Sequence, residues 1–258
     1  MKLYLKFFSI HLKSQMQYKT SLLLTIFGQF LTSFTALLGM WFMFSRFQKV
    51  EGFTFQQVLL CSATMLMAFS IAECFARGVD QFPQMIGNGE FDRALVRPRS
   101  LVFQVLASKI DFTRLGRFIQ AVILFGYAVP TSGVEWTPTR IATLVLMVLC
   151  GSVTFFCLFL LYAGISFFTL EGLEFMNIFT DGGREFGQYP FVIYGQDVLR
   201  VLTYVVPLAL FQYYPFLYLL GRETHVLYML MPLANLLFIV PTYAFWQFGL
   251  SRYKSTGS

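Results

Sequence analysis

Residues 139–169 read TRIATLVLMVLCGSVTFFCLFLLYAGISFFT, a stretch in which Arg140 is the only charged residue. A helix of roughly 20 apolar residues is long enough to cross the hydrocarbon core of a bilayer. This stretch is longer than that, so the helix is expected to tilt or to extend beyond the bilayer. The segment therefore predicts a transmembrane helix, and it decides the class of fold.

Five further apolar runs accompany this one, three before it and two after it. They cover residues 21–44, 53–76, 101–129, 194–220 and 226–250. In the 258 residues, 57% are hydrophobic and 12% are charged, about half the charge of an average soluble domain. This composition excludes a soluble fold. The sequence predicts an all-α membrane protein whose transmembrane domain, residues 21–250, has six helices.

The first twenty residues have the pattern of a helix that lies along the membrane surface. At 100° per residue, Lys2, Lys6 and Lys13 fall within one narrow sector. The opposite side carries Leu3, Tyr4, Phe7, Phe8 and Tyr18. Such a pattern is typical of an amphipathic interfacial helix, although a frayed basic tail is the alternative. The next run is too long for a signal peptide and lacks a small-residue cleavage site, so residues 1–20 are expected to be retained.

The basic residues indicate which side of the membrane each segment occupies. The chain has 19 Lys and Arg against 13 Asp and Glu, a net charge of +6. With residues 1–20 inside, only Arg46, Lys49, Arg140 and Arg222 lie in outer segments. Cytoplasmic loops carry an excess of Lys and Arg, so both termini, including the tail 251–258, are predicted to be cytoplasmic. Because the charge follows sidedness, nucleic acid is not expected as a partner.

The fifth run, residues 194–220, contains prolines that disturb a regular helix. Pro207 interrupts the run, and Tyr213, Tyr214 and Pro215 follow it. A proline inside a span removes a backbone hydrogen bond and usually kinks the helix. We expect the helix to end or bend near Pro207, followed by a short re-entrant or surface-lying piece through Tyr218. A single long kinked helix is the alternative.

Ionisable residues are scarce in the middle of the predicted spans. An intramembrane enzyme or a proton-coupled carrier usually needs such groups there. Six ionisable residues within or next to the apolar runs are assigned to cytoplasmic helix ends, where we expect them to be solvated or paired. They are Glu73, Asp111, Glu171, Glu174, Asp197 and Arg200. The sequence has no recognisable catalytic motif, so no catalytic or cofactor-binding residue is predicted in this chain.

The cysteines do not form a recognisable motif either. Cys61, Cys74, Cys150 and Cys157 fall within or at the ends of apolar runs, and no C-x-x-C pair is present. The chain has two histidines to assist them. We expect four free thiols, no disulfide framework and no metal site.

Residues 77–100, which we call the elbow, lie between the second and third runs and read RGVDQFPQMIGNGEFDRALVRPRS. Phe82, Met85 and Ile86 are spaced for the apolar face of a short helix that ends at the glycines of residues 87–89. A second short helix is predicted over residues 90–96, with carboxylates at its start and arginines at its end, as the helix dipole favours. A compact, partly apolar segment on the cytoplasmic side is typical of a surface on which a partner docks. The alternative, equally weighted, is an elbow folded back on its own helices.

The order of these features resembles the type-2 permeases of ABC exporters, and more narrowly a six-span subgroup long catalogued as a domain of unknown function. Two motifs carry the resemblance, G-x-F-D-x-x-L-x-R-P at residues 89–98 and R-E-F-x-x-Y-P at residues 184–190. The basic amphipathic start, Pro207, the Tyr-Pro at 214–215, the Leu-Gly at 220–221, Gly249 and the end YKSTGS at 253–258 complete it. The likeness covers nearly the whole chain.

The resemblance implies a transport subunit in the plasma (inner) membrane of a prokaryote. Its partners would be a second six-span permease, identical or related, membrane lipid, and a pair of cytoplasmic ATPases that hold ATP and Mg²⁺. The elbow would carry the coupling helix, over about residues 81–95, and contact the ATPases. The ATPase-coupling residues would be Phe82, Met85, Ile86, Glu90, Phe91, Asp92, Arg93 and Arg97.

The expected cargo follows from the scarcity of charge in the middle of the spans. It is a hydrophobic or amphipathic compound, such as a lipophilic cation or drug, because aromatic and methionine side chains form adaptable apolar surfaces. Candidate residues of the substrate pathway are Phe30, Phe34, Met65, Phe69 and Tyr204. An ion-coupled secondary transporter of a lipophilic substrate is the main alternative, followed by a channel or membrane scaffold.

Overall fold

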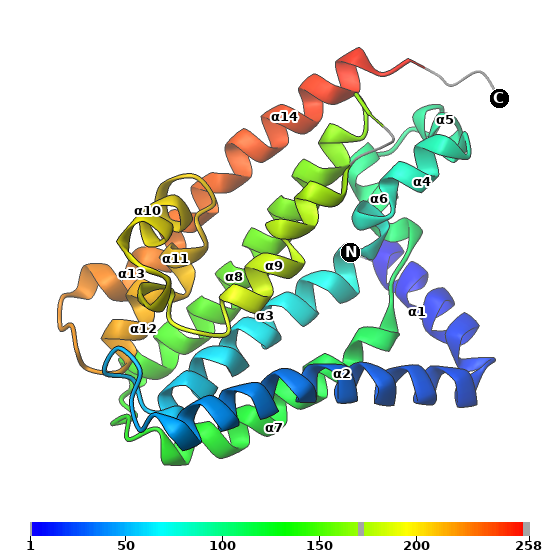
Figure 1. Ribbon diagram of the computed structural model, residues 1–258. Coiled ribbons are helices and arrows are strands. Elements are labelled where there is room, and N and C mark those ends of the chain that lie inside the picture. Colours follow the sequence, from blue (N-terminus) through cyan, green and yellow to red (C-terminus); the bar gives the residue numbers. More distant parts are fainter. Residues whose placement is uncertain (1, 170–172, 255–258) are drawn as a thin grey trace.

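A computed structural model describes residues 2–169 and 173–254 of the chain. In this part the chain folds into helices without a named strand (Figure 1). Five helices are long and apolar enough to cross a membrane, and a sharply bent helix pair is a sixth candidate. The prediction of an all-α membrane protein is therefore confirmed.

The first helix, α1 (Lys2–Met16), lies beside the bundle and not within it (Figure 1). The His11 ring, through Nε2, lies 3.1 Å from the carbonyl oxygen of Ala107. The amide of Gln15 donates to the carbonyl of Ile110 at 2.9 Å. Within the predicted 1–20, a helix is thus present over Lys2–Met16, and this part is not a frayed tail. Its position along the membrane surface stays a prediction.

The first two spans are α2 (Lys19–Arg46) and α3 (Phe55–Asp80). A capping box between Thr54 and Gln57 begins α3, because each residue satisfies a backbone N–H of the other. Helix α3 continues four residues beyond the predicted end at residue 76. Its side chains are mostly buried, whereas the apolar window of α2 is open on the surface of the chain.

The elbow contains two short helices, α4 (Phe82–Gly87) and α5 (Glu90–Leu95). Both agree with the predicted helical segments. Gly89 separates them with φ at 67°, in the left-handed region that glycine adopts without a steric penalty. The chain can therefore reverse direction between the two helices within two residues.

The predicted third span, residues 101–129, is wrong at its start. Helix α6 (Leu101–Ser108) is a separate element, and the span consists of η1 (Phe112–Arg114) followed by α7 (Leu115–Thr131). Lys109 has an extended backbone that ends α6. The Asp111 carboxylate then accepts from the backbone N–H of Thr113 and starts a new helix. The sequence is apolar on both sides of this break, and the prediction therefore joined residues 101–129 into one helix.

The fourth span, α8 (Pro138–Ile165), confirms the prediction for residues 139–169 to within a few residues at its C-terminal end. The Thr137 side chain caps its N-terminus. Helix α8 packs along α3, and together they form the centre of the bundle (Figure 1). The fully buried rings of Phe69 on α3 and Phe155 on α8 meet edge to face, with centroids 4.9 Å apart.

The fifth passage is irregular. It consists of η2 (Leu173–Ile178), α9 (Asp181–Phe186), η3 (Phe191–Tyr194), α10 (Gln196–Tyr204), α11 (Leu208–Phe211) and α12 (Tyr213–Leu219). Helix α10 and the segment Leu208–Leu219 meet at an angle of 91°. The predicted break at Pro207 is confirmed, and the alternative of one long kinked helix is wrong. Phe211 and Phe216 are fully buried, so the piece after the break is part of the core and does not lie on the surface.

The last span comprises α13 (Val226–Ala234), the turn η4 (Asn235–Phe238) and α14 (Ile239–Arg252). It agrees with the predicted run at residues 226–250. Helix α8 ends at the same end of the bundle as α4 and α5, whereas α13 begins at the opposite end (Figure 1). The chain between α8 and α13 must therefore cross the bundle, which gives six passages although the fifth is not one helix.

Candidate functional site

The elbow is attached to the membrane helices through an aromatic cluster. Phe82 and Phe91 are fully buried and meet edge to face, with ring centroids 4.9 Å apart. Phe82 also lies 4.9 Å from the ring of Trp246 on α14 and 5.1 Å from that of Phe167, just after α8. Edge-to-face pairs add to the energy of burial. The cluster therefore fixes α4 and α5 to the ends of two spans.

A hydrogen bond reinforces this attachment at the end of the last span. The Tyr253 hydroxyl donates to a carboxylate oxygen of Asp92 at 3.0 Å. Its ring also packs edge to face on Phe91, with centroids 5.1 Å apart. Burial, and then the hydrogen bond to Asp92, raises the pKa of Tyr253 to about 12, so the hydroxyl remains a donor at neutral pH.

The eight predicted coupling residues fall into three groups. Phe82, Ile86 and Phe91 are buried in the core of this chain. Met85 and Asp92 are half-buried, and Glu90, Arg93 and Arg97 are exposed. One face of the elbow thus folds back on its own helices, as one of the two readings predicted, while the other face is open. Docking of a partner on the open face stays a prediction.

A second feature is a cluster of charged side chains at the elbow end of the bundle. The Glu73 carboxylate on α3 lies 3.0 Å from the Arg114 guanidinium and 2.7 Å from that of Arg117. All three side chains are largely buried. Buried charges are tolerated when they are paired, so these ion pairs tie α3 to η1 and α7. Glu73 was predicted to be solvated or paired, and it is paired.

Asp111 extends the charge cluster outside the spans. Its carboxylate lies 3.4 Å from Arg114 and 3.8 Å from Arg77, and Arg77 also pairs with Asp80. Burial raises the pKa of Asp111, but the hydrogen bonds from Thr113 and the two arginines outweigh it, and the pKa lies below the ordinary value. Asp111 is therefore ionised at neutral pH and helps to close the junction between α3 and α7.

The predicted spans at residues 139–169 and 194–220 leave residues 170–193 as a connection between spans, but α9 packs inside the bundle. The Arg184 guanidinium lies 5.0 Å above the ring of Phe69, halfway along α3, and pairs with Asp181 and Glu185. Charged residues therefore do reach the middle of the bundle. Close packing explains the position, because a Cβ on Gly187 would lie 1.7 Å from the Met65 side chain.

A signal for this placement was present in the sequence but was not used. Gly183 and Gly187 are spaced four residues apart on either side of Arg184. This spacing of small residues allows membrane helices to approach closely. The charged residues of α9 instead favoured a loop outside the bundle. Glu171 lies outside the described residues, as does the side chain of Glu174.

The five predicted pathway residues do not converge on one place. Phe30 and Phe34 stack on each other on α2, with centroids 6.4 Å apart. Met65 and Phe69 are buried within the core. Tyr204 on α10 is 84% exposed.

An apolar cavity of about 450 Å³ lies where α3, α6, α8 and α14 meet. Its walls include Ile71, Phe75, Phe156, Leu160 and Tyr243. None of these residues was among the predicted pathway candidates. A cavity of this size and lining suits a small apolar ligand.

Metal and thiol chemistry find little support in the described part of the chain. There, no three His, Cys, Asp or Glu side chains lie together as a metal site would require. All four cysteines are free and buried. The features that remain are the elbow, the charge cluster and the apolar cavity.

A comparison of the sequence with known families identifies the family of the chain. The family described as "ABC-2 family transporter protein" matches residues 30–257. The chain belongs to this family. It is a type-2 ABC permease of the six-span subgroup, a multi-pass membrane protein and a transport component that is generally not catalytic. Membership of the ABC-2 family implies partnership with an ABC ATPase. No curated protein and no solved structure matches the chain.

Proposed function

We propose that this ABC-2 permease is one of two permease chains in an exporter of a hydrophobic or amphipathic compound, such as a lipophilic cation or drug. Two separate cytoplasmic ATPases supply the energy by binding and hydrolysing ATP with Mg²⁺. The complex lies in the plasma (inner) membrane of a prokaryote, with the elbow and both termini of this chain in the cytoplasm.

The observation that carries the proposal is the two-faced elbow. Phe82 and Phe91 anchor it to α14 and to the end of α8. Protein interiors are close-packed and transmit strain, so a displacement of α4 and α5 also displaces these spans. The exposed face offers Glu90, Arg93 and Arg97 to a partner. In this proposal the ATPases bind that face and move the elbow as they close on ATP.

The character of the cargo is supported by the interior of the bundle. The cavity beside α8 has an apolar lining. The charges that reach the bundle interior, Glu73 and Arg184, are already in ion pairs. A hydrated anion would have to break such pairs, whereas an apolar compound from the bilayer would not. These features favour a lipophilic cargo.

The second permease is supported by the surface of α2. Large apolar side chains along this helix are exposed in the single chain: Leu31, Phe34, Leu38, Trp41 and Phe42. An extended apolar surface of this kind marks a contact with lipid or with another protein. In the proposed complex, α2 faces the second permease chain.

The test is copurification and transport with the cognate ATPase. The assembled complex should contain ATPase and permease chains in equal number, and inverted vesicles should accumulate a lipophilic cation when ATP is added. Arg93→Glu, on the exposed face of the elbow, should reduce this transport at least tenfold without loss of folded permease. Arg252→Glu is the matched control, because Arg252 ends α14 outside the elbow and packs on Phe248. Equal transport by Arg93→Glu and the parent chain would contradict the proposed contact.

An ion-coupled secondary transporter is the second candidate. It is favoured by the charged residues of α9, since Asp181, Arg184 and Glu185 lie near the middle of the bundle. The same vesicles separate the two functions. Uptake that persists without nucleotide and stops when an ionophore dissipates the ion gradients would establish the secondary transporter and overturn the ATPase-driven exporter.

A further inference from the structure

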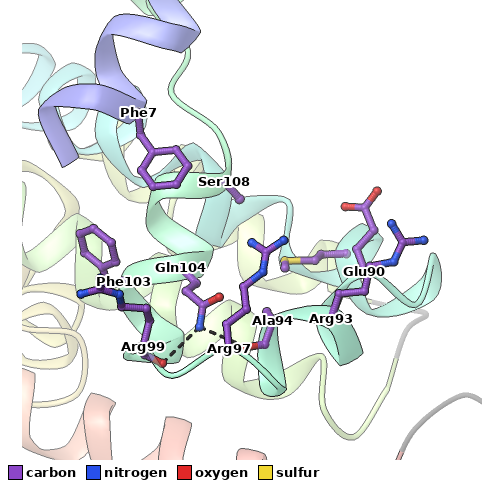
Figure 2. Close-up of a pocket in the computed structure, with 10 residues that line it drawn as sticks. Phe7, Glu90, Arg93, Ala94, Arg97, Arg99, Phe103, Gln104 and Ser108 are labelled. Atoms are coloured by element: carbon purple, nitrogen blue, oxygen red, sulfur yellow. Dashed lines mark hydrogen bonds between the residues drawn. The ribbon is translucent and has the colours of Figure 1, made fainter. Parts of the chain in front are cut away.

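A pocket of about 310 Å³ lies where α1, α5 and α6 meet, beside the elbow (Figure 2). We call it the junction pocket. Phe7 of α1 and Phe103 of α6 form one side of it, and Gln104 forms part of its wall. It is separate from the apolar cavity described above. Glu90, Arg93 and Arg97 of its lining belong to the elbow face that the proposed function assigns to the ATPases, whereas Arg99, Phe103 and Phe7 do not.

The junction pocket carries an excess of positive charge. Arg93, Arg97 and Arg99 line it together with Glu90, so three guanidinium groups and one carboxylate leave a net formal charge of +2. Figure 2 shows Arg97 directed into the space between Gln104 and the pair Glu90 and Arg93. Within the described residues, none of the three arginines has an ion pair with a carboxylate, in contrast to the arginines of the charge cluster.

The backbone around two of these arginines is held in place. The Gln104 amide donates to the carbonyl oxygens of Ala94 and Arg99, each at 3.1 Å. The turn that carries Arg97 and Arg99 is thereby fixed against α6. The amide oxygen of the Gln104 side chain, Oε1, is buried and accepts no hydrogen bond within the described part of the chain. The backbone that carries Arg97 and Arg99 is thus held in place through the Gln104 amide nitrogen, while both side chains are exposed.

The position of the junction pocket points to the membrane surface. Its wall includes Phe7 of α1, the helix with the amphipathic pattern of an interfacial element. Tyr4 of the same helix packs on Phe103, with ring centroids 6.2 Å apart. Apolar rings and guanidinium groups line the same pocket, a combination that matches the boundary between acyl chains and headgroups. Basic pockets at the cytoplasmic side of membrane helices bind anionic lipid headgroups.

We propose that the junction pocket binds the headgroup of an anionic phospholipid from the adjacent leaflet. Guanidinium groups match phosphate oxygens in geometry and charge, so Arg97 and Arg99 donate to the phosphate. The acyl chains leave past Phe7 and Phe103. A bound lipid would join α1 to α5 and steady the elbow at the membrane surface.

Binding of short-chain lipids to the purified full-length chain in detergent tests the proposal. Dioctanoyl phosphatidylglycerol should bind at least tenfold more tightly than dioctanoyl phosphatidylcholine, which has the same chains and a zwitterionic headgroup. Each of Arg97→Gln and Arg99→Gln should weaken phosphatidylglycerol about fivefold, the effect of one basic group near an anionic surface. Arg99→Lys should retain much of the affinity, and Arg252→Gln, outside the pocket, should bind as the parent chain does.

Several results would overturn the proposal. Equal affinity for the two lipids, or an equal loss in Arg252→Gln, would show non-specific binding. Displacement of phosphatidylglycerol by inorganic phosphate or by ATP at equal concentration would assign the pocket to a soluble anion. If Arg97→Gln and Arg99→Gln lose the ATPase on copurification but keep lipid affinity, the pocket belongs to the ATPase contact. Because lipid binding is measured on the permease alone, it is independent of the outcome of the transport experiment.

Discussion

Phe82 is the side chain on which the elbow depends most. It is fully buried and contacts Phe91, Phe167 and Trp246, which come from three different segments. Phe82→Ala removes these ring contacts and leaves a cavity, and such truncations cost about 3 to 5 kcal/mol. We expect a lower midpoint of thermal unfolding in detergent and faster proteolysis of the elbow.

A control for Phe82→Ala lies in the same segment. Val96 is 83% exposed just after α5, and exposed substitutions usually change stability by less than about 0.5 kcal/mol. Val96→Ala should therefore unfold as the parent chain does. Equal unfolding midpoints for Phe82→Ala and Val96→Ala would mean that the aromatic cluster contributes little to the attachment of the elbow.

Asp111 makes the stability of the chain depend on pH. Its folded-state pKa lies below the ordinary value because Thr113, Arg114 and Arg77 outweigh the effect of burial. A depressed pKa means that the carboxylate stabilises the fold above the unfolded pKa, near pH 4, and that this contribution is lost as pH falls through the folded pKa. Asp111→Asn should lower the free energy of unfolding by about 1 to 2 kcal/mol at pH 7. The loss should be much smaller in acid, where the Asp111 carboxyl group of the parent chain is also neutral.

The measurement is the unfolding midpoint of both chains between pH 7 and pH 3. Asp197→Asn is the control, because the Asp197 side chain is 97% exposed and its ion pair with Arg200 is also exposed. Such pairs contribute little, so this variant should match the parent chain throughout. A constant difference between Asp111→Asn and the parent chain at all pH values would contradict the role of the charge.

At the residue scale, the sequence predicted where a side chain lies better than which side chains it contacts. The charge pattern placed Glu73 and Asp111 at helix ends, and both are paired there. It did not identify Arg114 and Arg117 as the partners of Glu73, because α3 and α7 meet only in three dimensions. The spacing of Phe82 and Ile86 predicted an apolar face, but not that α8 and α14 would cover it.

At the scale of elements, the approach of α2 to α7 depends on one glycine. A Cβ on Gly116 would lie 2.2 Å from the carbonyl oxygen of Ile26. Gly116→Ala must therefore push the two helices apart. We expect the free energy of unfolding to fall by about 1 to 3 kcal/mol, as in overpacked cores. The same helix provides a control, since a Cβ on Gly126 would meet no atom within 4 Å.

Gly126→Ala should be neutral or slightly stabilising, because alanine favours a helix by up to about 1 kcal/mol. Unfolding midpoints measure both variants. Indistinguishable unfolding of Gly116→Ala and Gly126→Ala would contradict the close contact.

Elements with a strong periodic signal were predicted well, and elements defined by packing were not. Helix α8 has a long apolar run and was placed within a few residues. Helix α6 was merged with α7 because both are apolar, although Asp111 starts a new helix between them. Helix α9 was assigned to a loop because it is short and charged, yet Gly183 and Gly187 allow it to pack inside the bundle.

At the scale of the whole molecule, the order of passages fixes which segments share a side of the membrane. Helix α8 ends next to the elbow, where Phe167 meets Phe82. Arg222, before α13, donates to the carbonyl of Gly52, in the loop between α2 and α3 at the opposite end. The irregular fifth passage therefore crosses the bundle, as six spans require. Helix α10 lies beside α13 and away from the elbow (Figure 1), so the assignment of Asp197 and Arg200 to a cytoplasmic helix end is wrong.

Labelling from the two sides of the membrane tests this arrangement. Asn88→Cys places a thiol on the elbow, and Glu135→Cys and Thr224→Cys place thiols in exposed loops at the opposite end. The native cysteines are buried and should react slowly. A membrane-impermeant maleimide should label positions 135 and 224 in intact cells, and position 88 only in inverted vesicles. If positions 224 and 88 react from the same side, the fifth passage turns back without crossing, and the six-span arrangement is wrong.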